Sequence, residues 1–236
     1  MTTACAITLG IALALYLAAA LLFQGQFLLR KHGWDAPGRK SLGLGLAVHL
    51  IGMILHLMLS GQSPFTSMLV IISWLVVALV VASLLAERYL HLRHLGLLSA
   101  PLAFLGLLYP LLMPIRFEQA ESILVEYPFL GVHVVLTLLG HVGFALAFCA
   151  AIVYLVQHQA LKKGQLNRYL PALDTTGEAT FRFAGAGFFP LPAGFMVTKM
   201  PAFASTSVVV PSSSILGCRA LIAAWITWIC CEISES

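Results

Sequence analysis

The chain contains very little charge. Of its 236 residues only 9% are Asp, Glu, Lys or Arg, whereas 60% are hydrophobic. A soluble domain carries about 25% charged residues. A chain this apolar cannot bury all of its hydrophobic side chains in the core of one water-soluble domain. Lipid must therefore be the solvent for much of the chain. The lack of charge therefore excludes an ordinary soluble domain.

Other features are also missing. The five cysteines form no CxxC pair, which argues against a thiol–disulfide carrier. The net charge is +4, but the basic residues lie in short gaps between apolar runs and form no patch, so no nucleic-acid partner is expected. The apolar runs contain no carboxylate within reach of their histidines. Catalysis needs a nucleophile, an acid–base pair or a metal cluster, so we do not expect an enzyme.

Long apolar runs are what the chain does have, and six are long enough, or nearly so, to cross about 30 Å of hydrocarbon. We interpret the first as a retained span, because no basic residue precedes it as in a signal peptide. The sequence predicts an all-α, polytopic transmembrane helical bundle over residues 1–198 and an atypical tail over 199–236. The predicted spans are 4–29, 42–59, 67–86, 95–113, 129–157 and 183–198, with a weaker seventh candidate at 215–231.

The basic residues predict the orientation of these spans. The first, third and fifth connections hold ten of the 13 Lys and Arg residues, whereas the second and fourth hold only Arg116. Loops rich in Lys and Arg face the cytoplasm. We therefore expect the N-terminus outside the membrane. The fourth connection, 114–128, mixes acidic and apolar residues and predicts a short amphipathic helix on the outer interface.

Histidine is the residue type that carries chemistry here. Four of the eight histidines (His32, His91, His94 and His158) lie in or beside the cytoplasmic connections, where a solvated imidazole needs no further explanation. The other four lie within predicted spans, where an ionisable residue is costly and suggests a functional site. They are His49 and His56 on the second span, and His133 and His141 on the fifth.

The spacing of these four histidines predicts two pairs at two depths in the membrane, which we call tiers. The second span runs outward and the fifth inward, so His56 and His133 lie near the outer surface, and His49 and His141 near mid-membrane. We expect each pair to face each other across the bundle. Paired neutral imidazoles suit axial ligation of a haem iron in a low-dielectric site. Alternatively, each His bonds to a neighbouring helix. Zinc is less favoured, since no Cys, Asp or Glu lies at matching depth.

Several motifs follow one another in a characteristic order. His133 opens a long span directly after an external loop, and that span ends in YLVQHQALKKG. A Leu-Pro-x-Leu turn (170–173) and a Glu with Phe-Arg-Phe (178–183) come next, and SPFTSMLVIISWLV (63–76) lies upstream. Over most of residues 42–195 this order resembles the cytochrome c assembly family, and within it the HemX-like and YpjD-like inner-membrane branch.

The resemblance implies a protein of the bacterial inner membrane that binds or exports haem for delivery to apocytochrome c outside. Its implied partners are the lipid bilayer, haem, and apocytochrome or other assembly subunits. His133 matches the family's external His and would ligate the haem iron. His49 and His56 lie where intramembrane His occurs, while His141 has no counterpart. A small-solute transporter or proton relay using the same histidines is the alternative, although no internal repeat is visible.

The chain also departs from the family pattern. The family's Trp-rich external segment, with its Trp-x-Trp-Asp core, is absent. The second external His that follows this segment in the family is absent as well. From about Val197 the sequence becomes rich in Ser, Pro and Cys, unlike the spans of the family. We interpret this as a divergent or frameshifted C-terminus.

Overall fold

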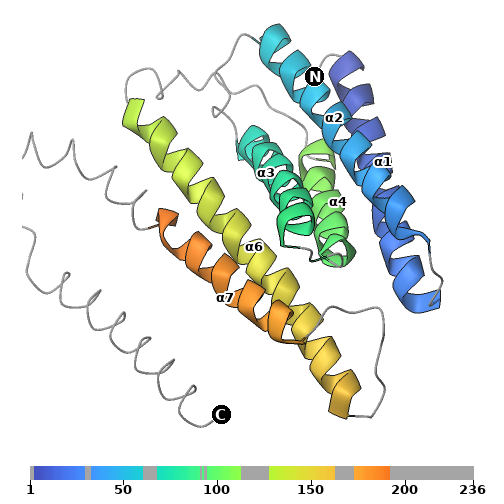
Figure 1. Ribbon diagram of the computed structural model, residues 1–236. Coiled ribbons are helices and arrows are strands. Elements are labelled where there is room, and N and C mark those ends of the chain that lie inside the picture. Colours follow the sequence, from blue (N-terminus) through green and yellow to red (C-terminus); the bar gives the residue numbers. More distant parts are fainter. Residues whose placement is uncertain are drawn as a thin grey trace, which may run out of the picture. The chain divides into compact units, whose positions relative to one another are not determined.

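The computed structural model describes residues 3–29, 33–60, 68–90, 92, 95–112, 128–162 and 173–191. These residues form helices and no strand, so the predicted all-α fold is confirmed. Helices that are consecutive in Figure 1 alternate in direction. The helices are α1 (Thr3–Leu29), α2 (Asp35–Ser60), α3 (Met68–Tyr89), α4 (Gly96–Leu112), α6 (Pro128–Lys162) and α7 (Leu173–Phe188).

Four of the helices are long and apolar enough to cross a membrane: α1, α2, α3 and α6. The fifth, α4, is equally apolar but has 17 residues and carries Pro101 and Pro110 within it. At 1.5 Å per residue it is about 26 Å long. The chain is thus a multi-pass helical membrane protein, as predicted, while the number of its spans remains a prediction.

The last described helix lies earlier in the chain than the span predicted at 183–198. It runs from Leu173 to Phe188 and includes the polar segment DTTGEATFR. Pro190 and Pro192 follow its end, and proline disfavours a helix interior because it lacks the N–H and clashes with the preceding turn. Residues 192–236, with the candidate span 215–231, lie outside the described part, and so does the expected interface helix, apart from Pro128.

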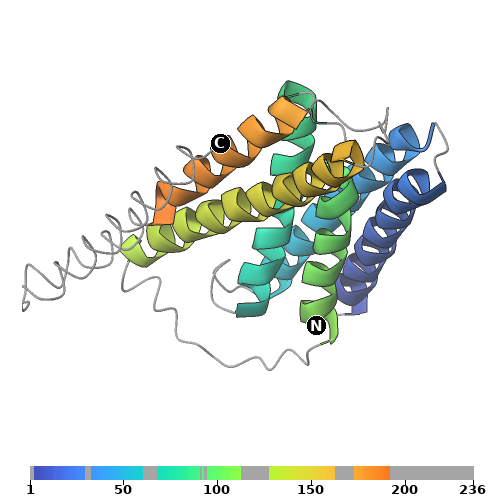
Figure 2. The same cartoon turned by 90° about the horizontal axis from the view of Figure 1, so that it is seen from below.

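The helices pack in a fixed order. The α1–α2 pair packs against α4 and α3. Helix α3 also contacts α6, and α6 packs against α7. In Figures 1 and 2, α3 and α4 lie between the α1–α2 pair and the α6–α7 pair. The largest buried cluster joins α1 to α2, α3 and α4 and includes Tyr16, Leu42, Val80 and Leu107.

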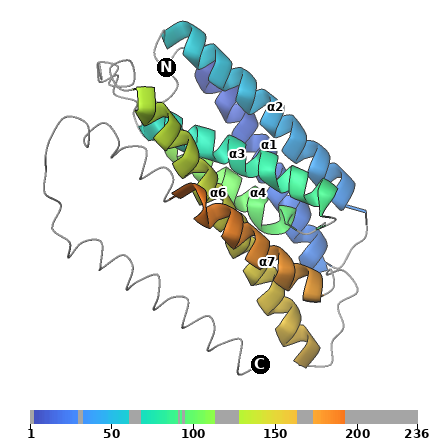
Figure 3. The ribbon, with the colours of Figure 1, turned by 60° about the vertical axis from the view of Figure 1, so that its left-hand side comes forward.

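Glycines bring the paired helices close together. A Cβ built on Gly143 of α6 would lie 2.5 Å from the Cα of Gly187 on α7. In the other pair, a Cβ on Gly45 of α2 would lie 2.8 Å from the ring of Tyr16 on α1. Helices in membranes associate through such small residues, because lipid provides no hydrophobic drive for them to meet. Figure 3 shows α7 lying along α6.

Candidate functional site

His49 lies at the centre of the α1–α2 interface. Its side chain is 0% exposed, and its Nδ1 lies 3.2 Å from the hydroxyl of Tyr16 on α1. The two rings meet edge to face, with centroids 5.9 Å apart. Gly45, one turn earlier on α2, gives the Tyr16 ring room to lie there. His49 therefore bonds to a neighbouring helix, and its Nε2 is buried with no hydrogen-bond partner.

His141 has the opposite environment. It lies on an exposed face of α6, and its Nδ1 is 2.7 Å from the carbonyl oxygen of Thr137, one turn earlier. Because a carbonyl only accepts, Nδ1 must carry the proton, and in a neutral ring Nε2 is then a lone-pair donor. Metal-bound histidines commonly hold their second nitrogen in this way, which fixes the tautomer and the ring orientation.

His133 and His56 are both partly buried. His133 lies in the second turn of α6, eight residues before His141, or about 12 Å along the helix axis. His56 lies seven residues, or almost two full turns, beyond His49, on nearly the same side of α2. Both helices present these imidazoles near the end that the positive-inside rule assigns to the outer surface.

The structure does not bring the two tiers face to face. Within the described residues α2 and α6 make no packing contact, because α3 and α4 stand between them (Figure 3). His49 turns to α1, and His141 is exposed. Sequence spacing predicts the depth of each histidine along the membrane, but it does not predict the direction in which the side chain points. Haem ligation by any of the four histidines remains a prediction.

Sequence reasoning missed two polar side chains. Tyr16 lies within the predicted first span, 4–29, where nothing singled it out, yet its hydroxyl is the partner of His49. Glu87 was assigned to a solvated connection, but it is only 7% exposed and its Oε1 accepts a hydrogen bond from the N–H of Gly96 at 3.1 Å. That bond caps the start of α4. No sequence signal distinguished either residue from its neighbours.

Metal binding by a conventional cluster has no support in the described part of the chain. No three of its His, Cys, Asp and Glu side chains gather closely enough to hold a metal ion. The two cysteines that the structure describes, Cys5 and Cys149, are buried and unpaired. Among the described residues, the imidazoles of α2 and α6 are the donors that a candidate haem site could use.

Comparison with known proteins gives one match. The sequence model of the cytochrome C assembly protein family matches residues 40–197, which is 158 of the 236 residues. No curated protein and no solved structure matches the chain. The match begins in the second turn of α2 and continues past α7, so it includes all four histidines, whereas α1 and Tyr16 precede it. This multi-pass membrane protein therefore belongs to the cytochrome c assembly protein family, whose role is in cytochrome c biogenesis.

Proposed function

We propose that this protein handles haem during cytochrome c biogenesis, binding it through His133 and His141 of α6 for delivery at the outer face of the membrane. The observation that carries this proposal is the pair of histidines on one helix within the family match, neither of them fully buried. Haem is the cargo, and no catalytic turnover by the chain is involved.

The four histidines differ in how well they fit this role. Neutral imidazole is a common axial ligand of haem iron and adds no charge to an apolar site. His141 fits best chemically, since its ring is already oriented and Nε2 is available. His133 and His56 are accessible in part and lie nearer the outer end. His49 fits least, because a side chain that is 0% exposed cannot reach a ligand without movement of α1.

The same proposal places the protein in the bacterial inner membrane with its N-terminus outside. The described basic residues at helix ends support this orientation: Arg39 and Lys40 lie at the start of α2, Arg88 at the end of α3 and Lys162 at the end of α6. All are exposed and lie at the lower end of the bundle in Figure 1. Apocytochrome c or another assembly subunit would receive the haem on the opposite side.

Absorbance spectra test the proposal. The purified full-length chain, supplemented with haem, should show a Soret band that weakens in His133→Ala and His141→Ala. His158→Ala is the matched control, because that imidazole stacks on Tyr154 at the other end of α6, with centroids 6.1 Å apart. It should leave the band unchanged.

Two results would contradict the proposal. A wild-type protein that stays colourless after haem supplementation would remove its basis. A Soret band that survives both α6 substitutions but disappears in His49→Ala would move the site to the α1–α2 interface. Solute flux in vesicles that persists without haem would instead support the transporter hypothesis.

A further inference from the structure

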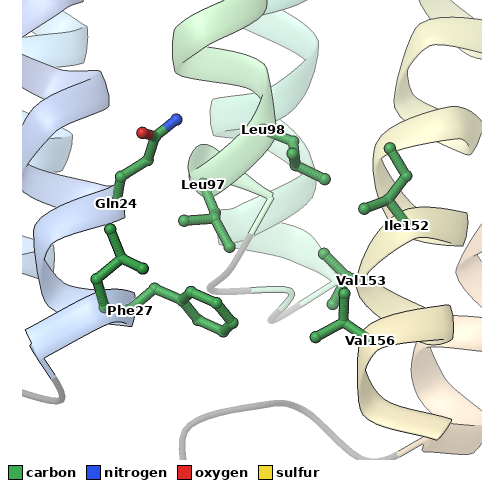
Figure 4. Close-up of a pocket in the computed structure, with 8 residues that line it drawn as sticks. Gln24, Phe27, Leu97, Leu98, Ile152, Val153 and Val156 are labelled. Carbon is green, nitrogen blue, oxygen red and sulfur yellow. The ribbon is translucent and has the colours of Figure 1, made fainter. Parts of the chain in front are cut away.

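An apolar groove lies among α1, α4 and α6, away from His49, His56, His133 and His141. Its volume is about 240 Å³. Figure 4 shows how the side chains of the three helices converge on it. Two of them, Leu28 at 75% exposed and Val156 at 40%, show that the groove opens to the surroundings. It is lined by Gln24, Phe27 and Leu28 of α1, Leu97 and Leu98 of α4, and Ile152, Val153 and Val156 of α6.

The lining indicates what kind of group fits. Apart from the Gln24 side chain it is aliphatic or aromatic, so water gains few hydrogen bonds there. None of the described residues that line it is a His, Cys, Met or Tyr, so none of these side chains could ligate a haem iron. An engineered apolar cavity of about 150 Å³ already binds benzene. The ligand group that suits this lining is a flexible hydrocarbon chain.

The groove lies at the basic end of the bundle. Leu97 and Leu98 belong to the first turn of α4, and Phe27 and Leu28 to the last turn of α1. The partial positive charge of the α4 N-terminus and the partial negative charge of the α1 C-terminus are therefore both close by. Lys162 is exposed six residues beyond Val156 on α6, or about 9 Å along its axis. In the sequence, Arg30 and Lys31 follow Leu28 within three residues.

Negative charge at this end does not cancel the positive charge. Among the described residues, Glu87 is buried under the start of α4 and Glu178 is paired with Arg182. Asp35 and Asp174 remain, against the exposed Arg39, Lys40, Arg88 and Lys162.

We propose that the groove holds an acyl chain of an anionic phospholipid, whose phosphate lies at the basic end of the bundle near Lys162. Basic pockets between transmembrane helices on the cytoplasmic side are known to take anionic headgroups. The hydrocarbon chain fills the gap between α1 and α6, which do not contact each other within the described residues. The inference requires no haem and is independent of the proposed haem site.

Native mass spectrometry of the full-length, haem-free protein tests it. The protein is titrated with phosphatidylglycerol and with phosphatidylcholine carrying the same acyl chains. The wild type should retain phosphatidylglycerol several-fold more strongly. Val156→Trp fills the groove and should abolish that retention, whereas Leu155→Trp, on the neighbouring residue outside the lining, should not. If Val156→Trp does not fold, Leu98→Trp fills the groove from α4.

The headgroup is tested separately. Lys162→Gln should reduce the preference for phosphatidylglycerol over phosphatidylcholine several-fold. Arg182→Gln, an exposed cation that is paired with Glu178 on a helix that does not line the groove, should leave it unchanged. Equal retention of the two lipids by the wild type would overturn the proposal. So would phosphatidylglycerol binding that survives Val156→Trp or Leu98→Trp, its displacement by added haem, or a dimer instead of a lipid adduct.

Discussion

At the scale of single residues, polar groups buried in the bundle are the most informative. His49 and Glu87 are each buried against one partner and leave a second polar atom unpaired, Nε2 in His49 and Oε2 in Glu87. A buried polar group that loses its partner costs more than the bond contributes when it is formed. Substitution of the partner should therefore reveal these contacts more clearly than any surface change.

Tyr16→Phe should destabilise the protein by about 1 kcal/mol, because it removes the hydroxyl that bonds to the buried Nδ1 of His49. Unfolding by sodium dodecyl sulfate in mixed micelles measures the loss. Tyr109→Phe is the control, since Tyr109 is 47% exposed. In a double-mutant cycle with His49→Leu, the two effects should not add. Additive losses would mean that the two side chains do not interact.

Glu87→Ala should cost about 1–2 kcal/mol, because it removes the acceptor that caps Gly96 at the start of α4. The same unfolding measurement on Glu178→Ala supplies the comparison. That residue is an exposed acid paired with Arg182 one turn away, and such surface pairs contribute about 0.5 kcal/mol or less. A cost for Glu87→Ala no larger than for Glu178→Ala would show that the cap does not stabilise the fold.

At the scale of elements, glycine decides which helices pair. The α6–α7 interface has Gly140 and Gly143 facing Gly187, with backbone atoms near van der Waals contact. The polar sequence of α7 provides little apolar surface of its own, so its close approach to α6 depends on these positions. A side chain added at one of these glycines should push the two backbones apart and release α7, while the other helices stay paired.

Gly143→Ala should weaken the α6–α7 pairing, because its new methyl would lie 2.5 Å from the Cα of Gly187. The loss should be about 1–3 kcal/mol, as for other overpacked interfaces. Gly185→Ala on α7 is the matched control, since nothing lies within 4 Å of its Cβ. It should be neutral or stabilise α7 by up to about 1 kcal/mol. Proteolysis between α6 and α7 would report the released helix, and equal cleavage of both variants would contradict the packing.

At the scale of the whole molecule, hydropathy predicted the helices but not which side of each helix packs against the others. Leu21 and Ile51 are exposed, while Leu9 and Leu42 are buried, although all four are equally apolar. A helix that is hydrophobic all round has no stripe to show which side meets protein. The depth of His49 and His141 therefore stays a prediction from the sequence, which gave no indication of the contact of His49 with Tyr16 or of the exposure of His141.

The charge distribution makes the last prediction, which concerns orientation. Reporter fusions after Ser63 in the second connection should place alkaline phosphatase outside, where it is active, and fusions after Lys163 in the fifth should leave it inactive in the cytoplasm.

Replacing Arg30, Lys31, Arg39 and Lys40 with Gln should produce a mixture of orientations, because it removes four of the basic residues that hold the first connection inside. Arg116→Gln, in a connection predicted to be external, is the control and should change nothing. Active phosphatase after Lys163 in the unaltered chain would reverse the orientation and place the basic end, with its groove, in the outer leaflet.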